Sequence, residues 1–148
     1  MNSSRITFTL NELVYVLNSA ADKHLRTRFD ITYSQFLFLV TLMGQNKPTP
    51  SLLAECLGVS RAAVSQRLPW FQHRGLVEVS KVAGNGKTLS VALTRTGAEL
   101  ATQSADFLEQ KFRVLFANSA SVDLDELDKT LSRIKKQLMG KQELRNAA

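Results

Sequence analysis

Apolar residues near the start of the chain recur every three or four positions, the spacing of one face of an α-helix. Thr9-Leu-Asn-Glu12 has the form of a capping box, which predicts a long first helix with Thr9 as N-cap that ends near Phe29. Thr32-Tyr-Ser-Gln35 repeats this arrangement and opens a second helix over residues 36–43. The second helix is apolar on most sides, so we expect it to be buried.

The pattern between residues 49 and 68 predicts two short helices that cross at a tight turn. Thr49 followed by Pro50 is typical of an N-cap and a first helical position. Small Ala54 allows close approach of the second helix, Gly58 suits a turn with positive φ, and Ser60 is placed to cap that helix. This is a helix-turn-helix pattern. The residues that fill its seam are Leu53, Leu57, Val59, Val64 and Leu68.

After Gly75 the period of the apolar residues changes from that of a helix to that of a strand. Apolar and polar residues alternate over 77–80 and again over 88–93, with the turn signal Gly84-Asn-Gly86 between them. A two-stranded ribbon directly after a helix-turn-helix is a wing, and we expect the hairpin turn at residues 84–86.

Two further helices follow the predicted wing. Thr94 starts a long one, and Ser121-Val-Asp-Leu124 marks a break and a new cap. The last helix carries an apolar stripe at alternating three- and four-residue steps, close to that of a coiled coil. Its members are Leu124, Leu127, Leu131, Ile134 and Leu138. A single copy of the chain would leave the stripes of the first and last helices poorly covered, which predicts a dimer built from both ends of the chain.

Charge and composition agree with this layout. The chain of 148 residues has a formal net charge of +6. Residues 47–95 contain seven basic and two acidic residues, so the helix-turn-helix segment carries +5 of that excess. Such a surface favours phosphate binding. We expect one domain and no membrane span, because no apolar run approaches about 20 residues. The absence of an export signal and the single cysteine, Cys56, favour the cytoplasm.

The order and spacing of these segments resemble the multiple-antibiotic-resistance regulator (MarR) family of winged-helix proteins. The likeness runs from about Leu10 to Leu138. The segments that carry it are Ile31-Thr-Tyr-Ser-Gln35, Leu53-Ala54, Leu57-Gly-Val-Ser60, Val64-Ser-Gln-Arg-Leu68, Arg74-Gly-Leu-Val77 and Leu93-Thr-Arg-Thr-Gly97. The resemblance implies a mainly α fold with a small two- or three-stranded antiparallel wing. It also implies a dimeric repressor that a small aromatic ligand or oxidation releases from DNA.

Within this frame residues 1–148 form a single MarR-like domain. Residues 32–94 form the winged helix-turn-helix module, and residues 8–30 and 95–140 form the dimerisation helices. We expect Ser60, Arg61, Ala62, Ser65 and Gln66 to meet the major groove of double-stranded DNA, Arg67 and Arg74 to contact phosphates, and Asn85 and Lys87 to approach the minor groove. Thr49 completes the predicted DNA-binding residues.

Four positions depart from the family pattern. Asn85 and Lys87 stand near the wing tip where the family usually has Asp and Arg, and Gln66 stands at a frequent Arg position. Pro69 lies inside the recognition helix, where it lacks the N–H that would bond to the carbonyl of Ser65. We expect a kink there. Pro69 and the altered wing tip motivate an alternative function, a winged-helix interaction protein that has lost operator binding and acts through a protein partner.

Other candidate chemistry in the sequence is weaker. Tyr15, His24, Tyr33 and Phe36 could line an effector pocket, although such residues are more often plain core or surface. The default interpretation of Cys56 is a small buried thiol, and the alternative is a redox switch. The acidic run 123–128 suits a helix start, and Gly84-Asn-Gly-Lys-Thr88 suits a wing turn better than a phosphate-binding loop. We expect no catalysis, cofactor or metal.

Overall fold

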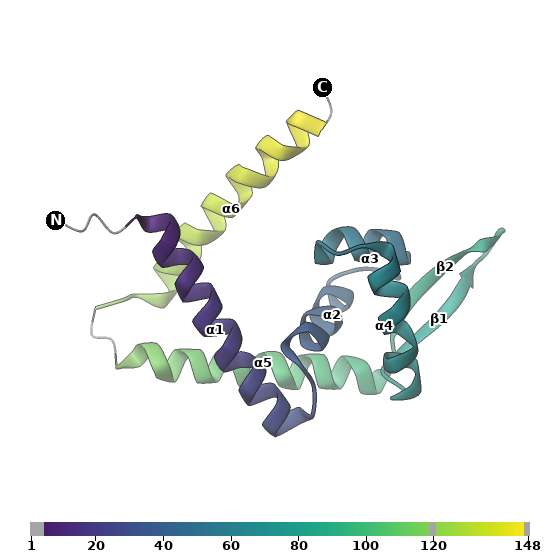
Figure 1. Cartoon of the computed structure of the whole chain (residues 1–148), viewed down its shortest axis with the longest axis horizontal. Coiled ribbons are helices and arrows are strands. Elements are labelled where there is room, and N and C mark those ends of the chain that lie inside the picture. The colour runs from purple at the N-terminus through teal and green to yellow at the C-terminus, as the bar shows by residue number, and fades with distance from the viewer. Residues whose placement is uncertain (1–4, 119–120, 147–148) are drawn as a thin grey trace. The chain divides into compact units, whose positions relative to one another are not determined.

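The computed structural model describes residues 5–118 and 121–146, without the side chains of Asn85 and of residues 141–146 (Figure 1). The chain forms two compact units, residues 1–108 and residues 109–148. The first unit holds α1, α2, α3, α4, β1, β2 and most of α5, and the second holds the end of α5 and α6. Across the described residues no helix is long and apolar enough to cross a membrane.

Helix α1 spans Ile6–Phe29 and starts earlier than the sequence predicted. Arg5 is the N-cap and makes no side-chain capping bond, so the prediction of Thr9 as N-cap is wrong. The backbone carbonyl of Arg5 accepts hydrogen bonds from the N–H groups of Phe8 and Thr9, at 2.8 and 3.3 Å. Because these donors are satisfied within the helix, the helix does not need the predicted capping box.

Helix α2 spans Tyr33–Met43 and begins with the predicted capping box. The Thr32 hydroxyl accepts from the Gln35 N–H at 3.1 Å, and the Thr32 N–H donates to the Gln35 side chain at 2.7 Å. Asp22 of α1 accepts the N–H of Tyr33 at 2.7 Å, which connects the two helices. The hydrogen bond from Arg26 and that from the Tyr33 N–H hold the pKa of the Asp22 carboxyl below its usual value.

Helices α3 (Pro50–Leu57) and α4 (Arg61–His73) form the predicted helix-turn-helix. Gly58 ends α3 with φ 65° and ψ 33°, the left-handed conformation that glycine adopts without strain. The seam is buried at Leu53, Val64 and Leu68. Phe38 of α2 stacks on Phe71 of α4 with ring centroids 4.2 Å apart. Helices α2, α3 and α4 therefore share one core.

Strands β1 (Val77–Val82) and β2 (Asn85–Leu93) pair antiparallel as a hairpin that extends away from the helices (Figure 1). The turn lies at residues 83–84, with Gly84 at φ 81°, because Val82 pairs with Asn85 after a register shift. The predicted turn at 84–86 is therefore displaced, and Gly86 lies within β2. The Val91 N–H donates to the Pro48 carbonyl at 2.9 Å and ties β2 to the loop before α3.

Helix α5 (Arg95–Ala117) starts at a joint of three residues. The Thr94 hydroxyl accepts from the Gly97 N–H at 3.0 Å and donates to the Gly75 carbonyl at 2.6 Å. A Cβ on Gly97 would lie 1.9 Å from the Leu76 carbonyl oxygen. Only glycine therefore permits this approach of α5 to the chain that enters the wing.

Helix α6 spans Leu124–Asn146, and Asp123 caps it by accepting the N–H groups of Asp125 and Glu126 at 3.0 and 3.1 Å. The acidic run thus serves as a helix start, as the sequence indicated. Across the described residues, no group of three or more His, Cys, Asp or Glu side chains could hold a metal ion.

We expect Gly97→Ala to lower the free energy of unfolding by about 1–3 kcal/mol, because the new methyl group collides with backbone rather than with a flexible side chain. Urea unfolding followed by circular dichroism measures this change. Gly140→Ala is the matched control: it lies inside α6 with nothing within 4 Å of an added Cβ. This control is expected to raise helix stability slightly. Equal stability of the two variants would contradict the close-approach argument.

Candidate nucleic-acid interface

The outward face of α4 carries the residues that the sequence predicted for base contact. Ser60, Arg61, Ala62, Ser65 and Gln66 are all exposed, while Val64 and Leu68 between them are buried. The Ser60 hydroxyl accepts the Ala63 N–H at 3.1 Å, which fixes the start of the helix. In the part of the chain that the structure describes, Arg61 and Gln66 have no hydrogen-bond or ion-pair partner. Both side chains are thus available to a ligand.

Thr49 and Arg67 flank this face. The Thr49 hydroxyl accepts the Leu52 N–H at 3.2 Å at the start of α3, and its own proton stays available to an acceptor. Arg67 is partly buried on α4. Both residues stay candidates for contact with the DNA backbone.

Arg74 differs from the other predicted phosphate contacts because it is engaged within the chain. Its guanidinium donates to a carboxylate oxygen of Asp30 at 3.1 Å and to the Asp30 backbone carbonyl at 3.3 Å. The same guanidinium lies over the Trp70 ring, 5.0 Å from its centroid. The sequence could not reveal these contacts, since Asp30 lies 44 residues away.

Helix α4 continues through Pro69 to His73 without interruption. Pro69 is exposed, so its ring lies on the surface of α4 rather than in the core. Proline still removes one backbone hydrogen bond from the helix at this point. The segment before Pro69 holds the exposed base-reading candidates, and the segment after it holds Trp70 and the buried Phe71.

The wing brings basic residues to the hairpin. Lys87 is exposed on β2, and Asn85 begins that strand, although its side chain lies outside the described residues. Lys81 is exposed on β1 opposite Leu89. Sequence reasoning counted the charge of Lys81 without assigning it to the site; its place near the end of β1 is the signal that identifies it as a further candidate.

Of the four predicted effector residues, two contact each other, one contacts a ring outside the set, and one is exposed. Tyr15 is 73% exposed on α1. His24 contacts Phe107 edge-on with centroids 6.1 Å apart, and Tyr33 lies 6.0 Å from Phe36. Partial burial raises the pKa of the Tyr33 hydroxyl. Tyr33 and Phe36 thus lie together on α2, whereas His24 packs against Phe107 of α5.

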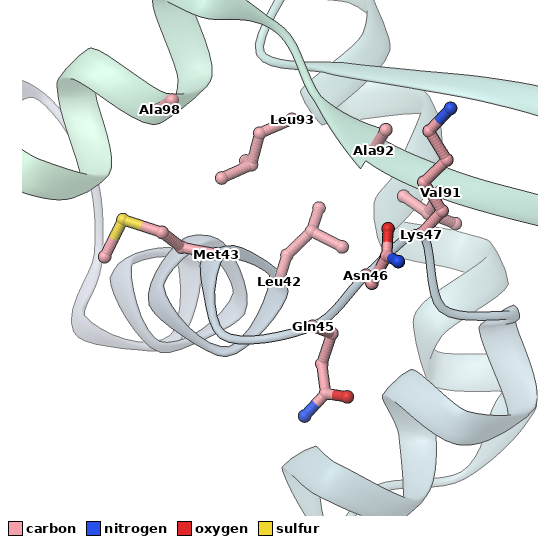
Figure 2. Close-up of a pocket in the computed structure, with 9 residues that line it drawn as sticks. All are labelled: Leu42, Met43, Gln45, Asn46, Lys47, Val91, Ala92, Leu93 and Ala98. Atoms are coloured by element: carbon pink, nitrogen blue, oxygen red, sulfur yellow. The ribbon is translucent and has the colours of Figure 1, made fainter.

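A cavity of about 260 Å³ lies elsewhere in the first unit, between the end of α2, strand β2 and the start of α5 (Figure 2). Leu42 and Leu93 point toward each other across it, whereas the Gln45 side chain points away (Figure 2). None of the four predicted effector residues lines this cavity.

Cys56 is exposed on α3. The first interpretation of this residue, a small buried thiol, is therefore wrong. Helix α3 buries Leu53 and Ala54 against α4, and the next turn of that helix directs Cys56 toward solvent.

Comparison with known proteins agrees with this geometry. Residues 29–87, which run from the end of α1 to the start of the wing's second strand, match the model of the MarR family. No curated protein matches the sequence.

Three solved structures show the same fold over nearly the whole chain. The transcriptional regulator BldR of Sulfolobus solfataricus is 16% identical with a TM-score of 0.74, and the match covers 89% of this chain and 93% of that one. Staphylococcus aureus MepR in complex with DNA is 19% identical with a TM-score of 0.72, and the match covers 92% and 98%. AbsC of Streptomyces coelicolor, a MarR family transcriptional regulator, is 24% identical with a TM-score of 0.73, and the match covers 95% and 97%.

The class defined by this fold is the winged helix-turn-helix protein with additional helices at both ends. The resemblance to the MarR family predicted from the sequence is confirmed, and so is the mainly α fold with a two-stranded wing. BldR and AbsC are described as transcriptional regulators.

Proposed function

We propose that this protein is a homodimeric transcription regulator of the cytoplasm that binds a pseudo-palindromic operator in double-stranded DNA. The observation that carries the proposal is the exposed polar face of α4, where Arg61 and Gln66 have no partner in the described chain. An arginine can bond two acceptors of guanine, and a glutamine can bond adenine in the same two-point manner. Both residues lie in the segment that carries +5 of the net charge.

The roles of the site residues follow from where they lie. Ser60, Arg61, Ala62, Ser65 and Gln66 meet base edges in the major groove. Thr49 and Arg67 contact the DNA backbone beside that groove. Lys87 and Asn85, on the wing, approach the adjacent minor groove, where a lysine contributes charge without the fork of an arginine. The fold match to MepR supports this arrangement, since that protein has been solved in complex with DNA.

A dimer supplies the second half-site. Large apolar side chains stay exposed along α1 and α6 in the single chain, among them Phe8 at 64% and Leu138 at 61%. Apolar stripes of this length are typical of subunit interfaces. Two copies related by a two-fold axis would present their α4 helices to half-sites about one helical turn apart. Repression then follows from occupation of a promoter.

We expect Arg61→Ala to weaken binding to the cognate operator about tenfold or more and to relax the base preference at one position. Lys87→Ala is expected to weaken binding to all sequences alike and to reduce the salt dependence of log K by about one unit. Selection from random DNA, with and without phenolic ligands, first defines the operator. Fluorescence anisotropy titrations at several salt concentrations then measure both effects.

Matched controls for these substitutions lie outside the proposed interface. Arg133→Ala removes an exposed arginine from α6, and Lys136→Ala removes an exposed lysine from the same helix. Unchanged operator affinity in both Arg61→Ala and Lys87→Ala would show the site assignment to be wrong. Failure of the parent protein to select any DNA would favour the alternative function, an interaction protein that acts through a protein partner.

Leu131→Asp is expected to convert the dimer to monomer at micromolar concentration, because it places a charge in the centre of the α6 stripe. Leu131 is 46% exposed in the single chain. Ser132→Asp is the matched control, since it adds the same charge about 100° further round the helix. Light scattering coupled to gel filtration measures the mass of each variant. A monomeric parent, or a dimeric Leu131→Asp, would contradict this interface.

We further propose that a small ligand or oxidation releases the protein from DNA. Exposure of Cys56 on α3 leaves its thiol accessible to oxidants. We expect hydrogen peroxide to lower the operator affinity of the parent and to leave that of Cys56→Ser unchanged. The anisotropy titration described above measures this effect. Equal responses of the two proteins would exclude oxidation of Cys56 as the release step.

A further inference from the structure

Arg74 makes three contacts, two with Asp30 at the end of α1 and one with Trp70 of α4. Its guanidinium lies 3.1 Å from the Asp30 carboxylate, 3.3 Å from the Asp30 carbonyl oxygen and 5.0 Å from the centroid of Trp70. The Arg74 side chain is 38% exposed, whereas that of Asp30 is 90% exposed. The arginine is thus held between a carboxylate, a carbonyl group and an aromatic face.

Asp30 is held in an unusual backbone conformation. It ends α1 with φ 55° and ψ 38°, in the left-handed region, and the next residue, Ile31, is buried. Aspartate and asparagine tolerate this conformation better than other residues that carry a Cβ. The carbonyl oxygen and the carboxylate of Asp30 are therefore both presented to Arg74 by the turn that joins α1 to α2.

These contacts are made at the end of α4 that follows Pro69, where the helix has one backbone hydrogen bond fewer. Pro69 lacks the N–H that would bond to the Ser65 carbonyl, so the segment 69–73 is linked to the base-reading segment by one hydrogen bond fewer. Arg74 caps that segment, and its N–H donates to the Trp70 carbonyl at 3.2 Å. A tie from Arg74 to α1 thus constrains the end of the recognition helix.

We infer that Asp30 and Arg74, the Asp30–Arg74 clasp, position the recognition helix relative to α1. The inference rests on the proposed function, in which α1 belongs to the dimer interface and α4 reads DNA. In that dimer the clasp sets the separation and tilt of the two α4 helices, because each is tied to a helix that belongs to the interface. Arg74 is then a positioning residue that acts through α4, and not a phosphate contact.

The two roles of Arg74 predict opposite effects of Asp30→Asn. If Arg74 contacted phosphate, neutralising Asp30 would release the guanidinium and remove a nearby negative charge, so DNA binding would stay the same or tighten. If Arg74 positions α4, neutralising Asp30 weakens binding to the operator. Asparagine preserves the left-handed backbone, so the change is confined to the charge of the side chain.

The experiment compares Asp30→Asn, Arg74→Gln and the double variant with the parent, on the selected operator and on DNA of unrelated sequence. We expect Asp30→Asn to weaken operator binding about two- to fivefold, the range of an exposed ion pair. We expect the double variant to bind no more weakly than Arg74→Gln, because both changes break the same clasp. Affinity for unrelated DNA and the salt dependence of binding are expected to stay unchanged.

Trp70 supplies a readout that does not depend on DNA, since it is the single tryptophan of the chain. Displacement of the guanidinium from its ring is expected to change the intensity of tryptophan emission in Asp30→Asn and in Arg74→Gln alike. All titrations are made well below the unfolding temperature, which circular dichroism establishes for each variant.

Three outcomes would overturn the inference. One is unchanged or tighter operator binding by Asp30→Asn, and another is an equal loss of affinity for operator and unrelated DNA. The third is a salt dependence reduced by about one unit in Arg74→Gln, which indicates a lost phosphate contact. If the parent itself selects no operator, the proposed function fails. If the parent binds and Asp30→Asn binds equally well, only the inference fails.

Discussion

Burial of one face of α4 is the constraint on which the rest of the structure depends. Val64 and Phe71 are almost fully buried, and Phe71 stacks on Phe38 of α2. A helix anchored in this way cannot rotate freely about its axis. Rotation would expose these side chains to water and would lose about 1.5–3 kcal/mol of stabilising free energy for each of them. The polar face with Arg61 and Gln66 is therefore presented outward by the core, and the chemistry of the site follows from packing.

The same core extends through short polar joints to the elements at its edges. Asp22 accepts the first N–H of α2, the Pro48 carbonyl accepts from Val91 of the wing, and Thr94 joins α5 to Gly75. In each joint one of the two groups, at Tyr33, Pro48 or Thr94, lies at or beside the end of an element, where backbone groups have no partner within the element. Helix α1, the wing and the start of α5 are thus joined to neighbouring elements of the first unit by directional hydrogen bonds.

Sequence reasoning succeeded where a local rule decides the structure. The capping box at Thr32 and Gln35, the left-handed Gly58 and the cap at Ser60 each depend on residues within four positions of one another. It failed where the outcome depends on competition or on distant contacts. The capping box predicted at Thr9 is not used, because the helix begins at Ile6. The hairpin turn lies one residue earlier than predicted, because the strand register shifts beside Val82. Helical spacing did not separate the exposed Cys56 from the buried residues next to it.

Arg74 shows that its role depends on contacts that only the fold creates. By sequence it is one more basic residue in a basic segment, and phosphate contact is the reasonable assignment. In the fold, its guanidinium lies against Asp30 and Trp70, so contact with phosphate would compete with a carboxylate partner and an aromatic one. Arg61 bears the same charge, and among the described residues its side chain has no partner to lose. Two arginines of equal charge thus differ in the contacts that compete with DNA binding. This difference favours base contact for Arg61 and a positioning role for Arg74.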